Sequence, residues 1–175
     1  MTFVSNHDKN SWEGTEFEQF GDALEAAIVL SVVGEGIPLI YSGQEAGSDK
    51  RLLFFDKDEI DWREHELGDF YRHLFALKKQ HCALWNGAWG APMVRVPNSA
   101  ESAVLSFVRA HPAGEGGAAD AVFAVLNLSA SEHEVGFGEG PHPGSYLDAF
   151  SGEPVEVGAD DRMTLPPWGY VVLTR

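Results

Sequence analysis

Short apolar runs alternate with helical periodicity over the first 81 residues. Residues 37–41 form a continuous apolar run, which is typical of a strand covered on both faces, and residues 2–5, Thr-Phe-Val-Ser, are expected to form a short buried strand. After each run, apolar side chains recur at spacings of three and four, which predicts a helix. The two stripes are Phe17, Phe20, Leu24, Ile28 and Val32, and then Leu67, Phe70, Tyr71, Leu74 and Leu77. The order strand–helix–strand–helix predicts an α/β arrangement with parallel strands.

Local signals set the boundaries of these helices. Thr15 and Glu18 have the spacing of a capping box, in which each side chain bonds the other residue's backbone N–H. Gly34 and Gly36 are expected to end the first helix through left-handed backbone angles. A long loop over residues 46–63 separates the second apolar run from the second helix.

The second half has the pattern of an all-β domain. Short strand-like runs divided by turn residues predict an antiparallel β-sandwich, with a small barrel as the alternative. The expected strands are residues 93–96, 103–109, 121–128, 134–137, 145–147, 163–165 and 170–173, with a surface loop at 113–120. We therefore divide the chain into an α/β part (1–81) and an all-β part (82–175).

Composition narrows the ligand class. The chain has 12 basic and 27 acidic residues, which give a formal net charge of −15. This charge repels nucleic acid and anionic membranes, whereas a neutral ligand such as a sugar is compatible with it. Solubility alone also accounts for much of the acidity. One cysteine excludes an intrachain disulfide, no apolar run is long enough to span a bilayer, and no signal sequence is recognisable, so the location stays unknown.

Residues 3–8, Phe-Val-Ser-Asn-His-Asp, are the strongest chemical motif. Polar residues at the carboxyl end of a barrel strand face the active site, and an aspartate beside a histidine can hold vicinal hydroxyls. Trp12, in the following loop, is either a platform for a sugar ring or a loop anchor. Glu45 either reaches the same pocket or contacts the residues that line it. A purely structural role for Glu45 is at least as well founded.

Two motifs together resemble the α-amylase superfamily, glycoside hydrolase family 13. Residues 3–8 resemble the family's fourth signature region, and residues 36–45 resemble its eighth barrel strand, although Ile37 intervenes between the expected glycine and proline. The resemblance implies strands 7 and 8 of a partial (β/α)₈ barrel with their helices, followed by the C-terminal β-sandwich. It implies that Asp8 is the transition-state-stabilising carboxylate and that His7, with Asn6 beside it, binds the same sugar.

The resemblance also implies what these residues do not provide. The family's nucleophile and acid lie on its fourth and fifth strands, and no segment here matches them. We therefore expect a C-terminal fragment of a retaining glycosidase of starch or maltodextrin that is inactive alone. A non-catalytic α-glucan-binding or interaction module is the alternative. We expect no cofactor in this chain, although calcium is common in the family, and self-association through open barrel edges.

Overall fold

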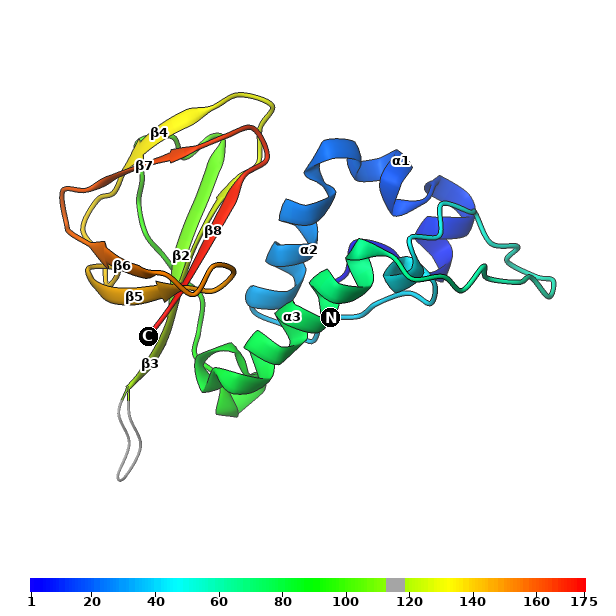
Figure 1. Cartoon of the computed structure of the whole chain (residues 1–175), viewed down its shortest axis with the longest axis horizontal. Helices are drawn as coiled ribbons and strands as arrows, with labels where there is room; N and C mark the ends of the chain where they lie inside the picture. Colours follow the sequence, from blue (N-terminus) through cyan, green and yellow to red (C-terminus); the bar gives the residue numbers. More distant parts are fainter. Residues whose placement is uncertain (113–118) are drawn as a thin grey trace.

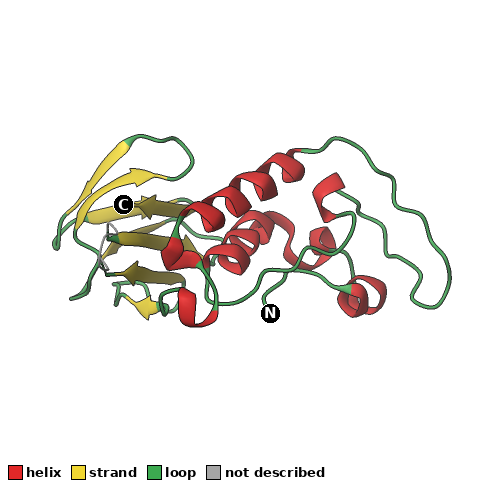
Figure 2. Cartoon of the chain, turned by 90° about the horizontal axis from the view of Figure 1, so that it is seen from below, coloured by secondary structure: helices red, strands yellow, loops and turns green. Residues whose placement is uncertain are grey.

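The computed structural model describes residues 1–112 and 119–175, and most of the expected loop at 113–120 lies outside them. Helices gather at one end of the molecule and strands at the other (Figures 1 and 2). The helices are α1 (Glu16–Phe20), α2 (Leu24–Val33) and α3 (Glu66–Gln80), with short helical turns η1 (Lys9–Glu13), η2 (Gly21–Ala23), η3 (Gln44–Ala46), η4 (Cys82–Leu84) and η5 (Gly87–Trp89). The strands are β1 (Val94–Arg95), β2 (Val104–His111), β3 (Asp120–Asn127), β4 (His133–Gly136), β5 (Gly144–Asp148), β6 (Pro154–Val157), β7 (Arg162–Leu165) and β8 (Tyr170–Thr174).

The first predicted helix forms in two pieces. Its capping box is present: the Glu18 N–H donates to the Thr15 hydroxyl at 3.3 Å, and the Thr15 N–H donates to the Glu18 carboxylate at 2.8 Å. Gly21 then adopts φ 49°, so α1 and α2 meet at the turn η2. Gly34 ends α2 in an extended conformation, not the left-handed one expected. A Cβ there would lie 2.6 Å from the Leu30 carbonyl oxygen, so close approach is what requires glycine.

The predicted strands at 2–5 and 37–41 are wrong as regular strands. Within residues 1–81, all of which the structure describes, they form a single parallel bridge between Thr2 and Pro38. The Thr2 N–H donates to Ile37 and the Leu39 N–H donates to Thr2, each at 2.9 Å. The parallel direction agrees with the expected α/β arrangement. A strand pair without a third strand is marginal, so the pairing does not extend.

The second half forms antiparallel sheets, as its pattern predicts. A six-stranded sheet has the order β1-β2-β3-β8-β5-β6, and a separate pair joins β4 to β7. β6 was not predicted. It begins at Pro154 and has an exposed glutamate between its two valines, and both features weaken the strand signal. β3 lies at the centre of the large sheet and is buried along almost its whole length.

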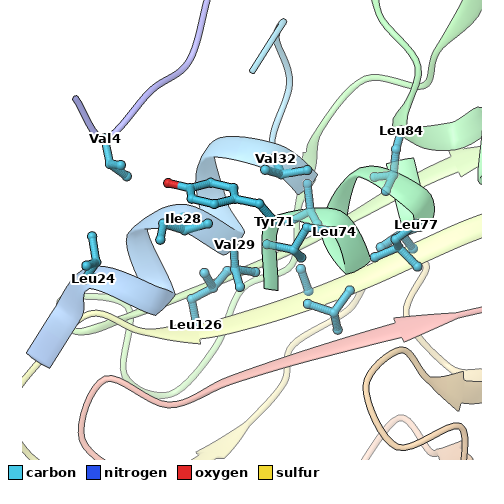
Figure 3. Close-up of a cluster of buried hydrophobic side chains, with 14 of the residues drawn as sticks. Val4, Leu24, Ile28, Val29, Val32, Tyr71, Leu74, Leu77, Leu84 and Leu126 are labelled. Carbon is cyan, nitrogen blue, oxygen red and sulfur yellow. The ribbon is translucent and has the colours of Figure 1, made fainter. Parts of the chain in front are cut away.

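The large sheet has a different neighbour on each face. On β3, Val122, Ala124 and Leu126 join the core under α2 and α3, whereas Phe123 and Val125 join the core under β4 and β7. This division follows from the two-residue period of a strand. Figure 3 shows Leu126 of β3 below Val29 of α2, and the ring of Tyr71 of α3 above Ile28. The helices thus bury their predicted stripes against the sheet.

Two buried cations join the helices to the sheet. Arg109 of β2 is 1% exposed and donates to carbonyl oxygens of Gly34 at 2.8 Å, Ala91 at 2.9 Å and Trp85 at 2.7 Å. Lys78 of α3 donates to the carbonyl oxygens of Val32, in α2, at 3.2 Å and of Leu84 at 2.6 Å. Carbonyls at the end of α2 have no partner within the helix, so these side chains satisfy them.

Among the described residues, no helix has both the length and the apolar character that crossing a membrane requires.

Candidate functional site

The Asn-His-Asp motif lies where the chain leaves the Thr2–Pro38 bridge and enters a helical turn. The Asn6 side-chain oxygen accepts from the Lys9 N–H at 2.8 Å, and its carbonyl accepts from the Asn10 N–H at 2.9 Å. Asn6 therefore caps the turn that follows, as asparagine does at helix starts. These bonds hold residues 7 and 8 at the start of the turn.

His7 and Asp8 lie side by side on the surface. Their side chains are 66% and 61% exposed, and His7 Nε2 lies 3.6 Å from Asp8 Oδ2. That separation is too long for a hydrogen bond, so the contact between the two side chains is weak. Both groups consequently keep free hydrogen-bonding capacity for a ligand that carries hydroxyls.

An exposed aromatic cluster adjoins His7. Trp12 of η1 and the loop residues Phe54 and Phe55 are 60%, 38% and 83% exposed. The Phe54 ring centroid lies 5.7 Å from that of His7, 5.2 Å from Trp12 and 4.7 Å from Phe55. Three aromatic rings and the histidine therefore form one continuous surface, which we call the aromatic cluster.

Sequence analysis named Trp12 as a candidate and did not name the two phenylalanines. They lie in the long loop between η3 and α3, which was treated only as a connection. The run Leu-Leu-Phe-Phe at 52–55 was the available signal, because four consecutive apolar residues are unusual in an exposed loop.

The loop that carries the phenylalanines is held by a buried amide. Asn10 is 3% exposed; its side-chain nitrogen donates to the Lys50 carbonyl at 3.1 Å, and its side-chain oxygen accepts from the Leu52 N–H at 2.7 Å. The Ser11 hydroxyl donates to the Leu52 carbonyl at 2.7 Å. A buried polar side chain is retained when its hydrogen bonds are made, so Asn10 fixes the loop to η1.

Charged contacts hold the loop on both sides of the phenylalanines. Arg51 bonds the Glu18 carboxylate through Nε at 2.7 Å and Nη2 at 3.0 Å, and this contact is the main reason that the pKa of Glu18 falls to about 2. Lys50, with the Leu53 and Glu59 N–H groups, lowers the pKa of Asp58 to about 2. Bidentate arginine–carboxylate geometry fixes orientation as well as distance.

Glu45 lies in a different environment. Its carboxylate accepts from the Gly43 N–H at 3.0 Å, and it lines a surface hollow with Arg63, His65 and Arg72 at the start of α3. No contact of the described residues joins Glu45 to His7 or Asp8. The geometry therefore brings Asp8 beside His7, and His7 and Trp12 beside the same Phe54, whereas Glu45 has its contacts elsewhere.

Within residues 1–112 and 119–175, no group of three or more histidine, cysteine, aspartate or glutamate side chains has the geometry of a metal site.

The chain resembles α-amylases in sequence. No protein-family model matches it. It is 25% identical over 165 residues to Alpha-amylase 2 of Dictyoglomus thermophilum. The match covers 87% of this chain and 26% of that protein, so the chain spans about a quarter of the curated relative.

Solved structures show the same likeness in fold. The chain superposes on a maltogenic α-amylase, AmyB, of Thermotoga neapolitana with a TM-score of 0.79 and 17% identity, over 98% of this chain and 40% of that one. An α-amylase of Geobacillus thermoleovorans complexed with acarbose gives 0.72 and 15%, over 98% and 38%. Other neighbours are AmyP structures in complex with maltose and maltotriose. The resemblance to the α-amylase superfamily is thereby confirmed in both sequence and fold.

Proposed function

We propose that this chain is the C-terminal part of a retaining glycoside hydrolase that acts on α-glucosidic bonds of α-glucans such as starch or maltodextrin. In this proposal Asp8 stabilises the transition state and His7 binds the same sugar ring. Residues 1–81 correspond to the end of the catalytic barrel, strands 7 and 8, and residues 82–175 to the β-sandwich. The α-amylase likeness and the exposed His7–Asp8 pair support the assignment.

The chemistry of the pair fits this role. Glycoside hydrolysis passes through an oxocarbenium-like state, and hydrogen bonds to ring hydroxyls that strengthen there lower the barrier. A carboxylate accepts such bonds from two hydroxyls at once, and a neighbouring imidazole adds a third. Because His7 and Asp8 are only weakly engaged with each other, both are available for these contacts.

We assign no residue of this chain to the breaking of the glycosidic bond. A retaining mechanism needs a nucleophile and an acid about 5–5.5 Å apart, and the family resemblance assigns these to strands that no segment of the 175 residues matches. We therefore propose that the isolated chain binds α-glucan without cleaving it. The exposed aromatic cluster beside His7 is the observation that favours binding.

Calorimetric titration of the purified chain with maltoheptaose tests the proposal. We expect weak binding, with a dissociation constant of about 1 mM, and its loss in Asp8→Ala. Asp22→Ala is the matched control, because Asp22 is an equally exposed aspartate on η2 and has no part in the site. Failure of the wild-type chain to bind maltoheptaose, or equal affinity in Asp8→Ala, would refute the assignment.

We also propose that the apolar edge beside the Thr2–Pro38 bridge associates with a second copy. A surface hollow of about 500 Å³ there is lined by Phe3, Phe20, Leu30 and Met93, among others. Phe3 and Ile37 are 37% and 59% exposed. Sedimentation that shows a monomer at every concentration would contradict this proposal.

A further inference from the structure

We infer that Phe54 and Phe55, together with Trp12, form a binding platform for a glucosyl residue next to the one held by His7 and Asp8. Asn10 is the positioning residue that holds this platform in place. The inference deepens the proposed function and rests on it, because it assigns the neighbouring part of the same α-glucan to the aromatic cluster.

Exposure separates these rings from a hydrophobic core. Phe55 is 83% exposed and Trp12 60%, and neither belongs to the two buried clusters of the protein. Leaving three large aromatic side chains in contact with water is unfavourable, because their burial would remove apolar surface from water. An exposed patch of this kind marks a binding surface.

The ring arrangement suits a flat, amphipathic ligand. Trp12 and Phe55 each contact Phe54, with interplanar angles of 42° and 74°, so the rings form a bent surface and not a parallel stack. A glucosyl ring presents an apolar C–H face to such a surface while its hydroxyls point outward. His7, whose ring contacts the same Phe54, lies where those hydroxyls find a polar partner.

Charge argues for a neutral ligand. The chain as a whole carries a net charge of −15, whereas the loop around the phenylalanines sets Lys50, Arg51 and Lys57 against Asp56 and Asp58. The overall charge repels an anionic ligand or an acidic protein surface, and the balanced loop gives a cationic one no local preference. Among neutral ligands, an oligosaccharide combines an apolar face with hydroxyl groups, which matches the aromatic cluster and the His7–Asp8 pair together.

The platform is held in position by η1. Asn10 makes two hydrogen bonds to the backbone on the N-terminal side of Phe54, at Lys50 and Leu52. Asn10 and Trp12 belong to the same turn, so the amide that fixes the loop also fixes its distance from Trp12. A site whose residues are held before the ligand arrives binds with a smaller loss of conformational entropy.

NMR titration of the full chain with maltoheptaose tests the inference. We expect Phe54→Ala and Phe55→Ala to weaken binding about tenfold, the effect of losing one aromatic contact. Leu53→Ala is the matched loop control and Trp62→Ala the matched aromatic control, because these side chains are 58% and 61% exposed and have no ring contact with the cluster. Both controls are expected to bind as the wild type does.

Asn10→Ala separates positioning from contact. It is expected to weaken binding as Phe54→Ala does and, in addition, to speed hydrogen exchange at the Leu52 amide, which Phe54→Ala leaves slow. Circular dichroism identifies any variant that fails to fold, and Phe55→Ala keeps the test decisive because that side chain is the most exposed of the three.

Three results would overturn the inference. If Phe54→Ala and Phe55→Ala bind normally while Asp8→Ala does not, the platform is wrong and the proposed function stands. If the wild-type chain does not bind maltoheptaose, the aromatic platform and the proposed function are both wrong. If the phenylalanine variants change only the sedimentation coefficient, the aromatic cluster contacts a second copy of the chain instead of a sugar.

Discussion

Replacing Arg109 by methionine should destabilise the protein strongly. The guanidinium group bonds the carbonyl oxygens of Gly34, Trp85 and Ala91 at 2.7–2.9 Å, and two further carbonyls at 3.3 Å. These carbonyls belong to the end of α2 and to the segment that leads into the sheet. Methionine keeps the aliphatic stem of the side chain and removes all five contacts.

The magnitude follows from the groups left without a donor. Three buried carbonyls lose their close partner at about 1 kcal/mol each, which gives a loss of about 3 kcal/mol in the free energy of unfolding. Burial lowers the pKa of Arg109 because the charged form loses hydration, so part of the gain from these bonds is already offset in the wild type. The expected loss is a large share of the total stability of an ordinary domain, about 5–15 kcal/mol.

Urea denaturation followed by circular dichroism measures this effect. Arg95→Met is the matched control: Arg95 lies on β1 and is exposed, so its replacement should change the free energy of unfolding by less than about 0.5 kcal/mol. Arg109→Lys should fall between the two, because one ammonium group cannot reach three carbonyls in different directions. A stability of Arg109→Met within about 0.5 kcal/mol of the wild type would refute the account of how the helices are joined to the sheet.

Two further predictions concern pH. The Arg51 side chain, followed by the Thr15 backbone, lowers the pKa of Glu18 to about 2, so the stabilisation that ionised Glu18 gives the folded state is present above pH 4.5 and is lost as the pH falls toward 2. Acid denaturation curves should show that the stability difference between the wild type and Glu18→Gln disappears over this range. A constant difference would contradict this prediction. Burial, followed by the charge of Arg109, lowers the pKa of Lys78 to about 8. Between pH 8 and 10.5 the Lys78 amine is therefore protonated in the unfolded chain and largely neutral in the folded one, so the folded state gains stability as the pH rises. Relative to Lys78→Met, the wild type should gain about 1–2 kcal/mol between pH 7 and pH 9.5, and a flat difference in urea denaturation would contradict this.

Local patterns predicted the parts of the fold that depend on local forces. The capping box at Thr15 and Glu18 and the apolar stripe of α3 are fixed by residues within a few positions of one another. The long strand β3 was predicted because burial on both faces leaves a continuous apolar run, and β2 because its β-branched and aromatic residues fit a sandwich strand. β6 was missed because its stability comes from pairing with β5, which its own residues do not indicate.

Features that depend on distant partners were not predictable in this way. Residues 2–5 and 37–41 have strand composition, but a ladder needs neighbouring strands, and only the Thr2–Pro38 bridge forms. Phe54 approaches His7 because contacts such as those of Asn10 with Lys50, Ser11 with Leu52 and Arg51 with Glu18 tie together segments that are far apart in the chain. Sequence alone therefore named His7, Asp8 and Trp12 as candidates, whereas the contact of His7 and Trp12 with Phe54 required the structure.

Hydrolysis of a chromogenic maltooligosaccharide by the purified chain, beside Asp8→Ala, tests the central proposal most directly. That proposal assigns the holding of the sugar to His7 and Asp8, and it assigns neither the nucleophile nor the acid to a residue of this chain. It predicts no turnover by either protein, although the wild type binds the substrate and Asp8→Ala does not. Turnover by the wild type that Asp8→Ala abolishes would contradict it, because carboxylates within this chain would then have to break the glycosidic bond.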